Sequence, residues 1–460
     1  MTLYPFQQAT VTRVLASTAR RTLLVSPTGT GKTHQLCAIA ERLAQTERVL
    51  IVVHRVELLQ QTRERLRAFN LDHGVIHGDE TGGKQIDVGM AQTIRKRGFS
   101  GYGTVLIDEA HRDEHKTIHA AEGLRRIIGF TATPTRNDRP LKDWFDEMIV
   151  ATSYSEAIAG GYIVPARVWA PRVPDLTGIR TIRGDFSEIE LAERMSQSKL
   201  VGDVVAEWMT NCSNSKTIAF CVNVNHAKMV HQAFAAAGVR AALVSGKTPD
   251  GERRMTMGLF RAGHVRVLVN VAVYIEGLDV GDASCIILAR PTKSLAFYMQ
   301  MAGRGCRSAP GKSSYRVLDH SGNVFRFGSP SQDREWSLEA GERVKRGEHA
   351  PGLRYCKHCF YVFTRLGETC PNCHAAVTTR PVRHVGGTLE EIAPETYKPI
   401  EGFISAYERG RRRAFAEAGA RNMTTREKFA FVNRRMAETV AIQRKSGRQL
   451  VIPLDPMLLF

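Results

Sequence analysis

A glycine-rich stretch near the N-terminus constrains the fold of this chain more than any other feature. Residues 26–33 read Ser-Pro-Thr-Gly-Thr-Gly-Lys-Thr. The apolar run at residues 22–25 predicts a buried strand before it, and residues 34–42 predict a helix after it. A strand, a glycine-rich turn and a helix N-terminus together present backbone N–H groups to a phosphate. The stretch therefore predicts a nucleotide site, although serine replaces the glycine that usually opens this pattern.

The side chains of this stretch suit ATP and its magnesium ion. Lys32 can reach the β- and γ-phosphates, and the Thr33 hydroxyl can bind Mg²⁺. The residues expected to contact the nucleotide here are Thr28, Gly29, Thr30, Gly31, Lys32 and Thr33.

A second charged motif supplies the acidic half of an ATPase site. Residues 105–111 read Val-Leu-Ile-Asp-Glu-Ala-His, an apolar strand that ends in two carboxylates. Asp108 is placed to hold magnesium, and Glu109 to orient and deprotonate the attacking water. Taken singly, each motif could be an ordinary glycine-rich turn or a charged strand end. Both motifs in this order favour ATP hydrolysis.

Strand and helix patterns alternate along most of the chain and predict an α/β fold. Such alternation is typical of parallel sheets covered by helices on both faces. The pattern runs from residue 1 to 152 and restarts over residues 153–330. Residues 331–350 are polar and predict a linker, followed by a four-cysteine segment at 351–378 and a basic helical region at 379–460. The predicted strands are 23–26, 49–53, 105–108 and 127–131, then 217–222, 241–245, 265–271, 285–288 and 316–318.

The charge of the chain points to a polyanionic partner. Lys and Arg number 64 against 46 Asp and Glu, a formal net charge of +18. Each basic residue set against a phosphate releases condensed counterions, so nucleic acid is the expected partner. An anionic membrane is the rival. The sequence shows no basic amphipathic N-terminal helix, lipidation signal or apolar run of about 20 residues, so we expect no membrane contact.

The nine cysteines divide into five scattered residues and a cluster of four. The cluster comprises Cys356, Cys359, Cys370 and Cys373, two C-x-x-C pairs. Four thiolates complete a closed tetrahedral zinc site without a position for water, so we expect residues 351–378 to form a small zinc ribbon around a structural Zn²⁺. Iron in the same cage and four unligated cysteines are the alternatives. The nearby aromatic residues 355, 360, 361 and 363 could stack on bases or fill a small core.

Two further stretches complete a recognisable set of motifs. Residues 270–279 read Asn-Val-Ala-Val-Tyr-Ile-Glu-Gly-Leu-Asp, and residues 300–307 read Gln-Met-Ala-Gly-Arg-Gly-Cys-Arg. Together with the first two motifs, residues 3–325 resemble the superfamily 2 DEAD/DEAH-box helicases. The run at 270–273, the stretch at 318–323 and the cysteine cluster resemble the RadD-like bacterial DNA helicases and related phage enzymes. This resemblance implies two tandem RecA-like P-loop domains that clamp ATP and bind a nucleic-acid strand.

The resemblance also implies roles for single residues. The implied nucleotide contacts beyond the loop are Gln7, at the adenine, and Gly277 and Asp279. The implied γ-phosphate contacts from the second domain are Gln300, Arg304 and Arg307, and the implied coupling residues are His111, Thr131 and Thr133. The implied strand contacts are His54, Arg55, Gln92 and Thr93. For Arg304 and Arg307 a solvated basic helix face is the alternative, and for His54 a packed strand end.

Arginines supplied by a second domain would tie hydrolysis to domain closure. An arginine that stabilises the transition state can raise the rate by about 10³–10⁵. If the arginine comes from another domain, hydrolysis requires that the two domains close. This dependence is the minimal requirement for a motor.

These observations predict an ATP-dependent DNA helicase or translocase that binds single-stranded or forked DNA without sequence preference. We expect a cytoplasmic protein of a bacterial or phage-infected cell, because the cysteine usage is typical of a reducing compartment and no signal peptide opens the chain. An RNA-stimulated ATPase is the nearest alternative. A nucleic-acid-binding zinc scaffold with an inactive ATPase core is another.

Three features fall outside the motif set. His111, His115 and His119 have the spacing of a helical metal face, but we expect a solvated or interdomain helix. Residues 401–450 hold twelve Lys or Arg and five Glu, and either track a phosphate backbone or form a solvated face. The apolar end, residues 450–452 and 457–460, is expected to pack on its own body, and could instead dock a protein partner.

Overall fold

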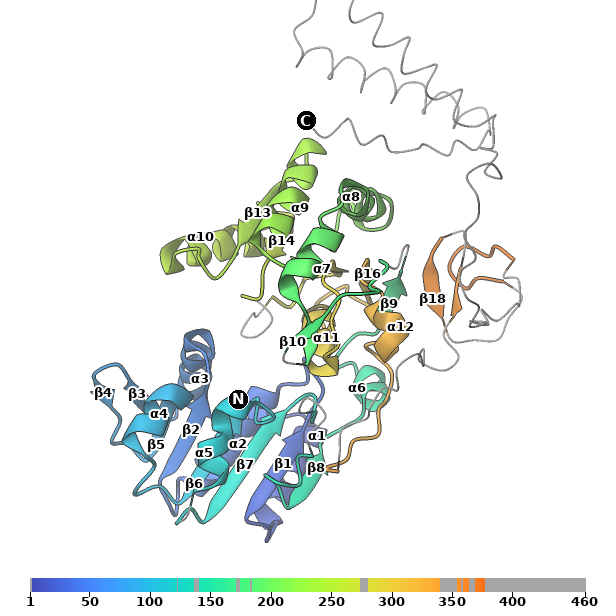
Figure 1. Cartoon of the computed structure of the whole chain (residues 1–460). Helices are drawn as coiled ribbons and strands as arrows, with labels where there is room; N and C mark the ends of the chain where they lie inside the picture. The colour runs from blue at the N-terminus through green and yellow to red at the C-terminus, as the bar shows by residue number, and fades with distance from the viewer. Residues whose placement is uncertain are drawn as a thin grey trace, which may run out of the picture. The chain divides into compact units, whose positions relative to one another are not determined.

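Two eight-stranded sheets form the framework of this chain (Figure 1). The computed structural model describes residues 2–121, 123–135, 140–170, 174–182, 184–273, 280–339, 354–356, 359–363 and 369–376. We call each sheet, with the helices packed on it, a lobe. Two α/β lobes in tandem fit the predicted RecA-like pair. The predicted helical region at 379–460 lies outside the described residues.

The first sheet is parallel except at one edge, where β4 pairs antiparallel with β3. Its strand order is β4-β3-β5-β2-β6-β7-β1-β8, and Figure 1 shows β2, β6, β7 and β1 side by side. The strands are β1 (Arg21–Val25), β2 (Val49–Val53), β3 (Gly74–His77), β4 (Glu80–Thr81), β5 (Ile86–Met90), β6 (Thr104–Asp108), β7 (Arg126–Thr131) and β8 (Glu147–Val150).

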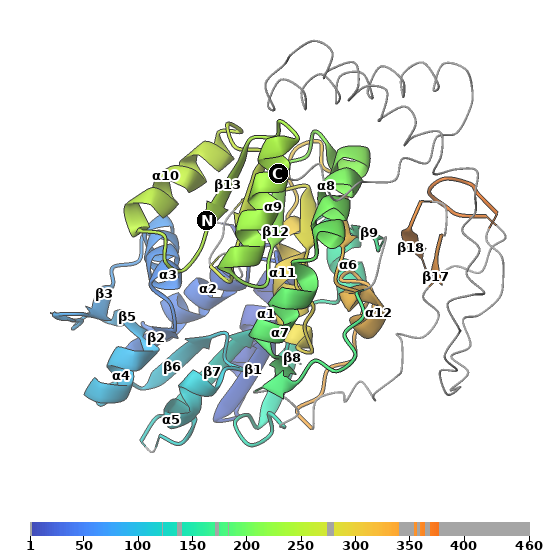
Figure 2. The same ribbon diagram turned by 45° about the horizontal axis from the view of Figure 1, so that its top comes forward.

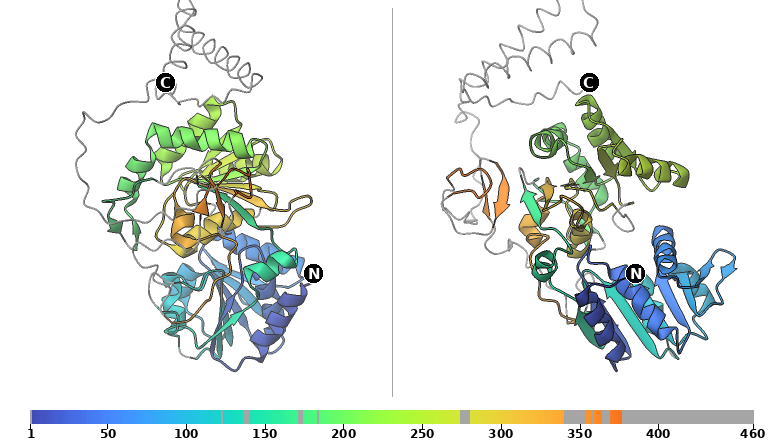
Figure 3. Two further views of the ribbon diagram at one scale, coloured as in Figure 1. Left: turned by 90° about the vertical axis from the view of Figure 1, so that its right-hand side faces the viewer. Right: turned by 180° about the vertical axis from the view of Figure 1, so that it is seen from behind.

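Helices cover both faces of the first sheet, which explains why its central strands are apolar throughout. In β2, Val49, Ile51 and Val53 face one core, while Leu50 and Val52 face the other. Figure 3 (left) shows helices on the two opposite sides of this sheet. Helices α1 (Pro5–Ala16), α2 (Lys32–Leu43) and α3 (Val56–Ala68) pack on one face, and α4 (Ala91–Arg97), the turn η1 (Asp113–His115) and α5 (Lys116–His119) lie toward the other.

The second sheet has the order β13-β14-β12-β15-β16-β9-β18-β17. It is parallel from β13 to β9, and β18 and β17 continue it with antiparallel pairing. The strands are β9 (Ala166–Trp169), β12 (Thr217–Phe220), β13 (Ala241–Val244), β14 (Val267–Asn270), β15 (Cys285–Leu288), β16 (Tyr315–Asp319), β17 (Arg354–Tyr355) and β18 (Tyr361–Phe363).

Helices also cover both faces of the second sheet. Figure 2 shows α8 (Ser198–Cys212) and α9 (Val224–Ala236) running side by side over one face. The other face carries α6 (Tyr154–Ala159), α10 (Asp250–Arg261), α11 (Leu295–Ala302) and α12 (Asn323–Phe327). The remaining elements are α7 (Glu188–Met195), the turn η2 (Gly303–Gly305) and a small hairpin of β10 (Thr181–Ile182) and β11 (Asp185–Phe186). None of the helices described in either lobe is long and apolar enough to cross a membrane.

Every strand predicted from the sequence lies within one or two residues of an observed strand, but several observed strands were not predicted. Strand β5 was not predicted because Asp87 and Gly89 interrupt its apolar run. Asp87 is nevertheless buried, because it accepts hydrogen bonds from the Gly83 and Lys84 backbone and from the Tyr102 hydroxyl, and pairs with Arg48. Hydrogen bonds and an ion pair with distant residues therefore allow an aspartate to be buried within a strand.

Part of the predicted linker, and the cysteine segment after it, are attached to the lobes. Strand β18, in the cysteine segment, pairs with β9 and so extends the second sheet (Figure 1). Within the predicted linker, Trp336 and Leu338 pack on the core of the first sheet, and the Leu338 carbonyl accepts a hydrogen bond from the Lys142 backbone at 2.9 Å. Residues 340–353 lie outside the described part.

The prediction of one solvated or interdomain helix for His111, His115 and His119 is wrong. These side chains are only 9, 0 and 6% exposed, and residues 111–119 form a turn, η1 and α5 in place of one helix. The His119 ring stacks on Trp144 with centroids 4.5 Å apart. Burial, together with nearby His54 and His119, lowers the pKa of His115 to about 3. Among the described residues, these histidines do not converge on a metal-sized site.

Candidate nucleotide site

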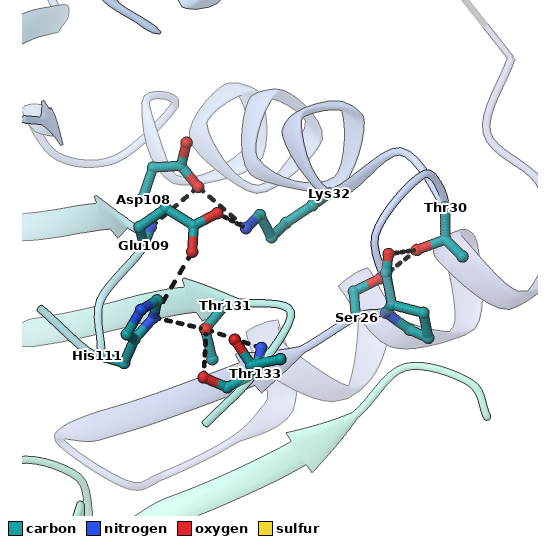
Figure 4. A network of polar contacts seen from close by, with 9 residues as sticks. Ser26, Thr30, Lys32, Asp108, Glu109, His111, Thr131 and Thr133 are labelled. Atoms are coloured by element: carbon teal, nitrogen blue, oxygen red, sulfur yellow. Dashed lines mark hydrogen bonds and ion pairs between the residues drawn. The ribbon is translucent and has the colours of Figure 1, made fainter. Parts of the chain in front are cut away.

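The carboxyl edge of the first sheet gathers most of the predicted functional residues. The glycine-rich loop follows β1, Glu109 follows β6, and Ala132 and Thr133 follow β7. Because these strands are parallel neighbours, their carboxyl ends meet at one edge, where α/β sheets usually bind ligands. Figure 4 shows Lys32, Asp108, Glu109, His111, Thr131 and Thr133 gathered there.

Backbone geometry explains the glycines of the loop. Gly29 and Gly31 have φ angles of +87° and +79°, values that favour glycine. Gly31 also cannot carry a side chain, because a Cβ there would lie 2.5 Å from Nε2 of Gln7. Helix α2 begins directly after Gly31, so its unpaired N–H groups open at the loop. This is the geometry of a phosphate cradle.

Ser26, which replaces the usual opening glycine, stabilises the loop through a buried hydrogen bond. Its hydroxyl lies 2.8 Å from the Thr30 hydroxyl, which in turn donates to the Pro27 carbonyl at 2.6 Å. Both hydroxyls belong to buried residues. Sequence reasoning noted Ser26 only as a deviation, since nothing in the linear pattern shows this pair.

Gln7 holds the same loop from helix α1. Its Nε2 donates to the Thr30 carbonyl at 2.8 Å, and its Oε1 accepts from the Tyr4 backbone at 2.9 Å. The side chain is 2% exposed. The adenine contact implied by the family resemblance stays a prediction, because both ends of this amide bind protein groups here.

Three aromatic rings beside Gln7 were missed by the sequence analysis. The rings of Tyr4 and Phe6 lie 4.6 and 4.8 Å from that of Tyr162. Tyr4 is 49% exposed, so this cluster borders solvent next to the loop. The sequence signal was the pair of aromatic residues that precede Gln7, but the distant Tyr162 could not be placed.

Lys32 lies between the two acidic residues that follow β6. Its Nζ is 2.5 Å from Oε1 of Glu109 and 3.5 Å from Oδ1 of Asp108 (Figure 4). Burial would lower the pKa of Lys32, but the attraction of Glu109 and Asp108 outweighs it, so this pKa is raised. Burial raises the pKa of Asp108, partly offset by Lys32. Lys32 therefore offsets part of the negative charge of the two carboxylates.

The donor set at this point fits Mg²⁺. Asp108, Glu109 and Thr33 supply hard carboxylate and hydroxyl oxygens, the ligands that this ion prefers. Two carboxylates face one ammonium group, which leaves an excess of negative charge for a divalent cation. If Lys32 moves to a phosphate, that excess grows and favours the ion further.

A chain of polar contacts leads from Glu109 to the predicted coupling residues (Figure 4). Nδ1 of His111 is 3.5 Å from Oε2 of Glu109 and 2.9 Å from Oγ1 of Thr131. The Thr131 hydroxyl accepts from the Thr133 backbone and donates to the Thr133 carbonyl, both at 3.1 Å. Because that hydroxyl proton is used, the His111 contact is satisfied when Nδ1 carries the hydrogen. The structure thus brings all three coupling residues together.

The 300–307 motif of the second lobe contacts the loop directly. The Cys306 thiol donates to the Thr28 carbonyl at 3.0 Å. A Cβ on Gly29 would lie 3.5 Å from Cγ of Arg307. Gln300 is 6% exposed, and within the described structure its Nε2 makes no hydrogen bond. Gly277 and Asp279 lie outside the described residues.

The predicted strand contacts lie at the same sheet edge. His54 and Arg55 follow β2, and Gln92 and Thr93 lie in the first turn of α4 after the neighbouring β5. Arg55 donates to the Ala272 carbonyl of the second lobe at 3.3 Å. The His54 ring meets that of His115 edge-on at 6.2 Å. Their contact with nucleic acid stays a prediction.

The four clustered cysteines converge on one point. Their sulfur atoms lie within 4.8 Å of one another, with Cys356–Cys373 at 3.7 Å and Cys359–Cys370 at 3.6 Å. Four Zn–S bonds of about 2.3 Å in a tetrahedron require sulfur atoms about 3.8 Å apart. Asn372 supplies N–H donors to the sulfurs of Cys370 and Cys359 at 3.4 Å, as expected around thiolate ligands. The residues therefore fit Zn²⁺.

Two family models match the two lobes. The model described as the res subunit of type III restriction enzymes matches residues 1–136, and the helicase conserved C-terminal domain matches residues 200–309. A 51.5 kDa protein of a Lactococcus phage (isolate 7-9) is 28% identical over 362 residues, covering 76% of this chain and 77% of that protein.

A yeast protein and a solved structure extend the similarity. The putative ATP-dependent helicase IRC3 of Saccharomyces cerevisiae is 27% identical over 328 residues, covering 64% of this chain but only 47% of its own length. The fragment structure of a putative HsdR subunit of a type I restriction enzyme from Vibrio vulnificus YJ016 has a TM-score of 0.57 at 22% identity. It covers 71% of this chain and 65% of that one, and at this identity it shows a shared fold alone.

Proposed function

The chain belongs to superfamily 2 of the helicases and is a nucleic-acid-dependent ATPase, and on this premise we propose that it is a DNA translocase or helicase. The observation that carries the proposal is the convergence of Lys32, Asp108 and Glu109 within 3.5 Å, at a loop that also touches the 300–307 motif. Hydrolysis chemistry and a second-lobe motif thus share one loop.

The proposed hydrolysis uses side chains of both lobes. Lys32 exchanges its carboxylate partners for the β- and γ-phosphates of ATP, which frees Glu109. Thr33 and Asp108 would hold Mg²⁺, which would screen the phosphate charge. Water attacks the γ-phosphorus, the bond to the bridging oxygen breaks, and Glu109 accepts a proton from that water.

The second lobe would complete the site and respond to its contents. Arg304 and Arg307 would stabilise charge on the departing phosphoryl group. Since these arginines come from the second lobe, ATP binding and phosphate release would alternately favour and relax lobe closure. The His111–Thr131–Thr133 chain would carry the state of Glu109 to the carboxyl edge where His54 and Arg55 lie.

DNA is the proposed partner for three reasons. The net charge of +18 favours a polyanion, and the strand residues would contact phosphate without reading sequence. The first-lobe family model describes a restriction-enzyme subunit, and restriction is a reaction of DNA.

We also propose that the four cysteines hold a structural Zn²⁺ whose four sulfur ligands leave no coordination position for a catalytic water.

The test is ATP hydrolysis by the purified protein, alone and with single-stranded DNA, forked DNA or RNA, at two salt concentrations. We expect strong stimulation by DNA over RNA. Lys32→Ala is expected to abolish turnover, and Glu109→Gln to lower it by about 10²–10⁴, the usual contribution of a general base. Both variants are expected to retain DNA binding. Preferential stimulation by RNA would replace the DNA proposal with an RNA-stimulated ATPase.

A further inference from the structure

The glycine-rich loop makes a contact that the hydrolysis chemistry does not use. The Cys306 thiol lies 3.0 Å from two carbonyl oxygens, that of Thr28 in the loop and that of Gly303 in its own turn, so its one hydrogen is shared between the two lobes. This cysteine is 2% exposed. Burial raises the pKa of this thiol to about 11, so it stays a protonated donor near neutral pH. The contact joins the loop of the first lobe to the turn that separates Arg304 from Arg307.

Two glycines allow the chains to approach this closely. A Cβ on Gly29 would lie 2.7 Å from Sγ of Cys306, and a Cβ on Gly303 would lie 2.8 Å from Cγ2 of Thr28. Both distances are shorter than real Cβ contacts allow. We call residues 28, 29, 303 and 306 the loop–turn contact. It has no space for a water molecule or for an added methyl group.

The second-lobe side of the loop–turn contact is fixed by its own lobe. The Cys306 carbonyl accepts from the Val164 backbone at 2.7 Å, and Arg307 pairs with Ile163 as an isolated β-bridge. A Cβ on Gly305 would strike the Tyr315 ring at 2.3 Å, so the turn lies against β16. A turn held this firmly moves with the lobe as a whole.

We propose that Cys306 is a positioning residue through which the glycine-rich loop sets the placement of Arg304 and Arg307. The inference rests on the proposed ATPase function. A nucleotide that shifts the loop shifts the Thr28 carbonyl and Gly29, which touch the thiol. The second lobe, with both arginines, follows because Cys306 lies between them and is fixed to that lobe. Misplacing a catalytic group by 1 Å can cost about 100-fold in rate, so a contact this tight controls turnover.

Substitutions of Cys306 separate positioning from stability. Cys306→Val removes the donor and adds a methyl group where Gly29 leaves no space. We expect it to lower DNA-stimulated kcat by about 10–100-fold while KM for ATP stays within about threefold, because Lys32 and Thr33, the side chains expected to bind the phosphates and Mg²⁺, are unchanged. Cys306→Ser retains a donor and is expected to recover most of the rate.

The matched control is Cys221→Val. Cys221 is equally buried, at 1% exposed, but lies in the apolar core between the second sheet and α8 and α9. We expect it to leave kcat unchanged. If the two valine variants lose kcat equally, or if the loss in Cys306→Val follows its loss of thermal stability, the positioning role is wrong.

Thiol alkylation tests the contact without measuring activity. Cys306 is labelled with N-ethylmaleimide and quantified by mass spectrometry, with and without a non-hydrolysable ATP analogue and single-stranded DNA. Because the bound analogue holds the loop against the turn, we expect it to slow labelling of Cys306 by at least about tenfold, and Cys221 to be unaffected. Binding of a fluorescent analogue is measured in parallel. Nucleotide binding without protection of Cys306 would overturn this inference alone, whereas no nucleotide binding would overturn the proposed function as well.

Discussion

At the scale of single residues, Glu109 has a strained backbone conformation that its neighbours hold in place. Its φ of +50° lies in the left-handed region, where a non-glycine residue costs about 1–3 kcal/mol. The conformation is fixed by neighbours: its N–H donates to Oδ1 of Asp108 at 3.0 Å, and its carboxylate reaches Lys32 and His111. This conformation directs one carboxylate toward both Lys32 and His111.

Gln7 offers a prediction at the same scale. Gln7→Ala removes the donor to the Thr30 carbonyl and leaves that buried group unsatisfied, at a cost of about 1–3 kcal/mol. We therefore expect weaker binding of ATP and of GTP by similar factors, measured by titration with fluorescent analogues. Thr12→Ala, on the exposed face of the same helix, serves as the control. A selective loss of ATP affinity would show instead that Gln7 reads the adenine base.

At the scale of elements, β9 joins the cysteine segment to the second sheet. Strand β18 pairs antiparallel with β9, and the Ala170 N–H donates to the Phe360 carbonyl at 3.1 Å. Arg167 donates to Oδ1 of Asn372 at 2.6 Å and lies over the rings of Trp169 and Tyr361. The four-cysteine segment thus covers an edge that would otherwise present unpaired backbone groups.

Removal of the proposed zinc ion is therefore expected to loosen the edge of the second sheet. Without zinc the short β18 segment has little core of its own, so chelation should undock it from β9. We expect hydrogen exchange of the Ala170 amide to accelerate by at least about tenfold after chelation, measured by mass spectrometry. Arg167→Ala should also accelerate exchange of the Ala170 amide, without lowering the zinc content. The control Arg254→Ala, on the exposed side of α10, should leave this exchange unchanged. Unchanged exchange in the metal-free protein would show that docking is independent of the ion.

At the scale of the described chain, two connections join the lobes. One is the direct link from β8 to α6, and the other is the segment 329–339, which leaves the second lobe and returns to the first. Along it, Ser331 accepts from the Ala166 backbone at 2.7 Å and Asp333 from the Ser155 backbone at 2.9 Å, before Trp336 and Leu338 reach the first core. A second connection of this kind limits how far the lobes can separate.

Buried histidines predict how stability depends on pH. Burial lowers the pKa of both His226 and His320 to about 4. Between pH 6.5 and 4 the unfolded chain therefore binds protons that the folded chain does not, and each residue removes about 1 kcal/mol of stability per pH unit as pH falls. We expect the urea midpoint to drop between pH 7.5 and 5.0, and His226→Gln to flatten that drop. His264→Gln, at an exposed position, should leave the drop unchanged. An equal drop in the unmodified protein and in both variants would show that His226 does not cause it.

The sequence alone determined the local chemistry and the class of fold. Continuous apolar runs such as residues 49–53 specify strands buried on both faces, and the glycines and carboxylates of the two ATPase motifs are adjacent in the chain. Their local geometry follows from a few neighbouring residues. For the same reason the four cysteines, in two short pairs, could be assigned to one ion-sized site.

Only the tertiary structure decided which distant groups meet. It buried Asp87 in a strand and placed β9 between β16 and the cysteine segment. It also buried His115 and His119 where we expected a solvated or interdomain helix. It also set Cys306 against Thr28, a pair 278 residues apart. Burial and hydrogen bonding of this kind depend on how separate elements pack, and no local pattern records the partner that a side chain will find across a sheet edge or between two lobes.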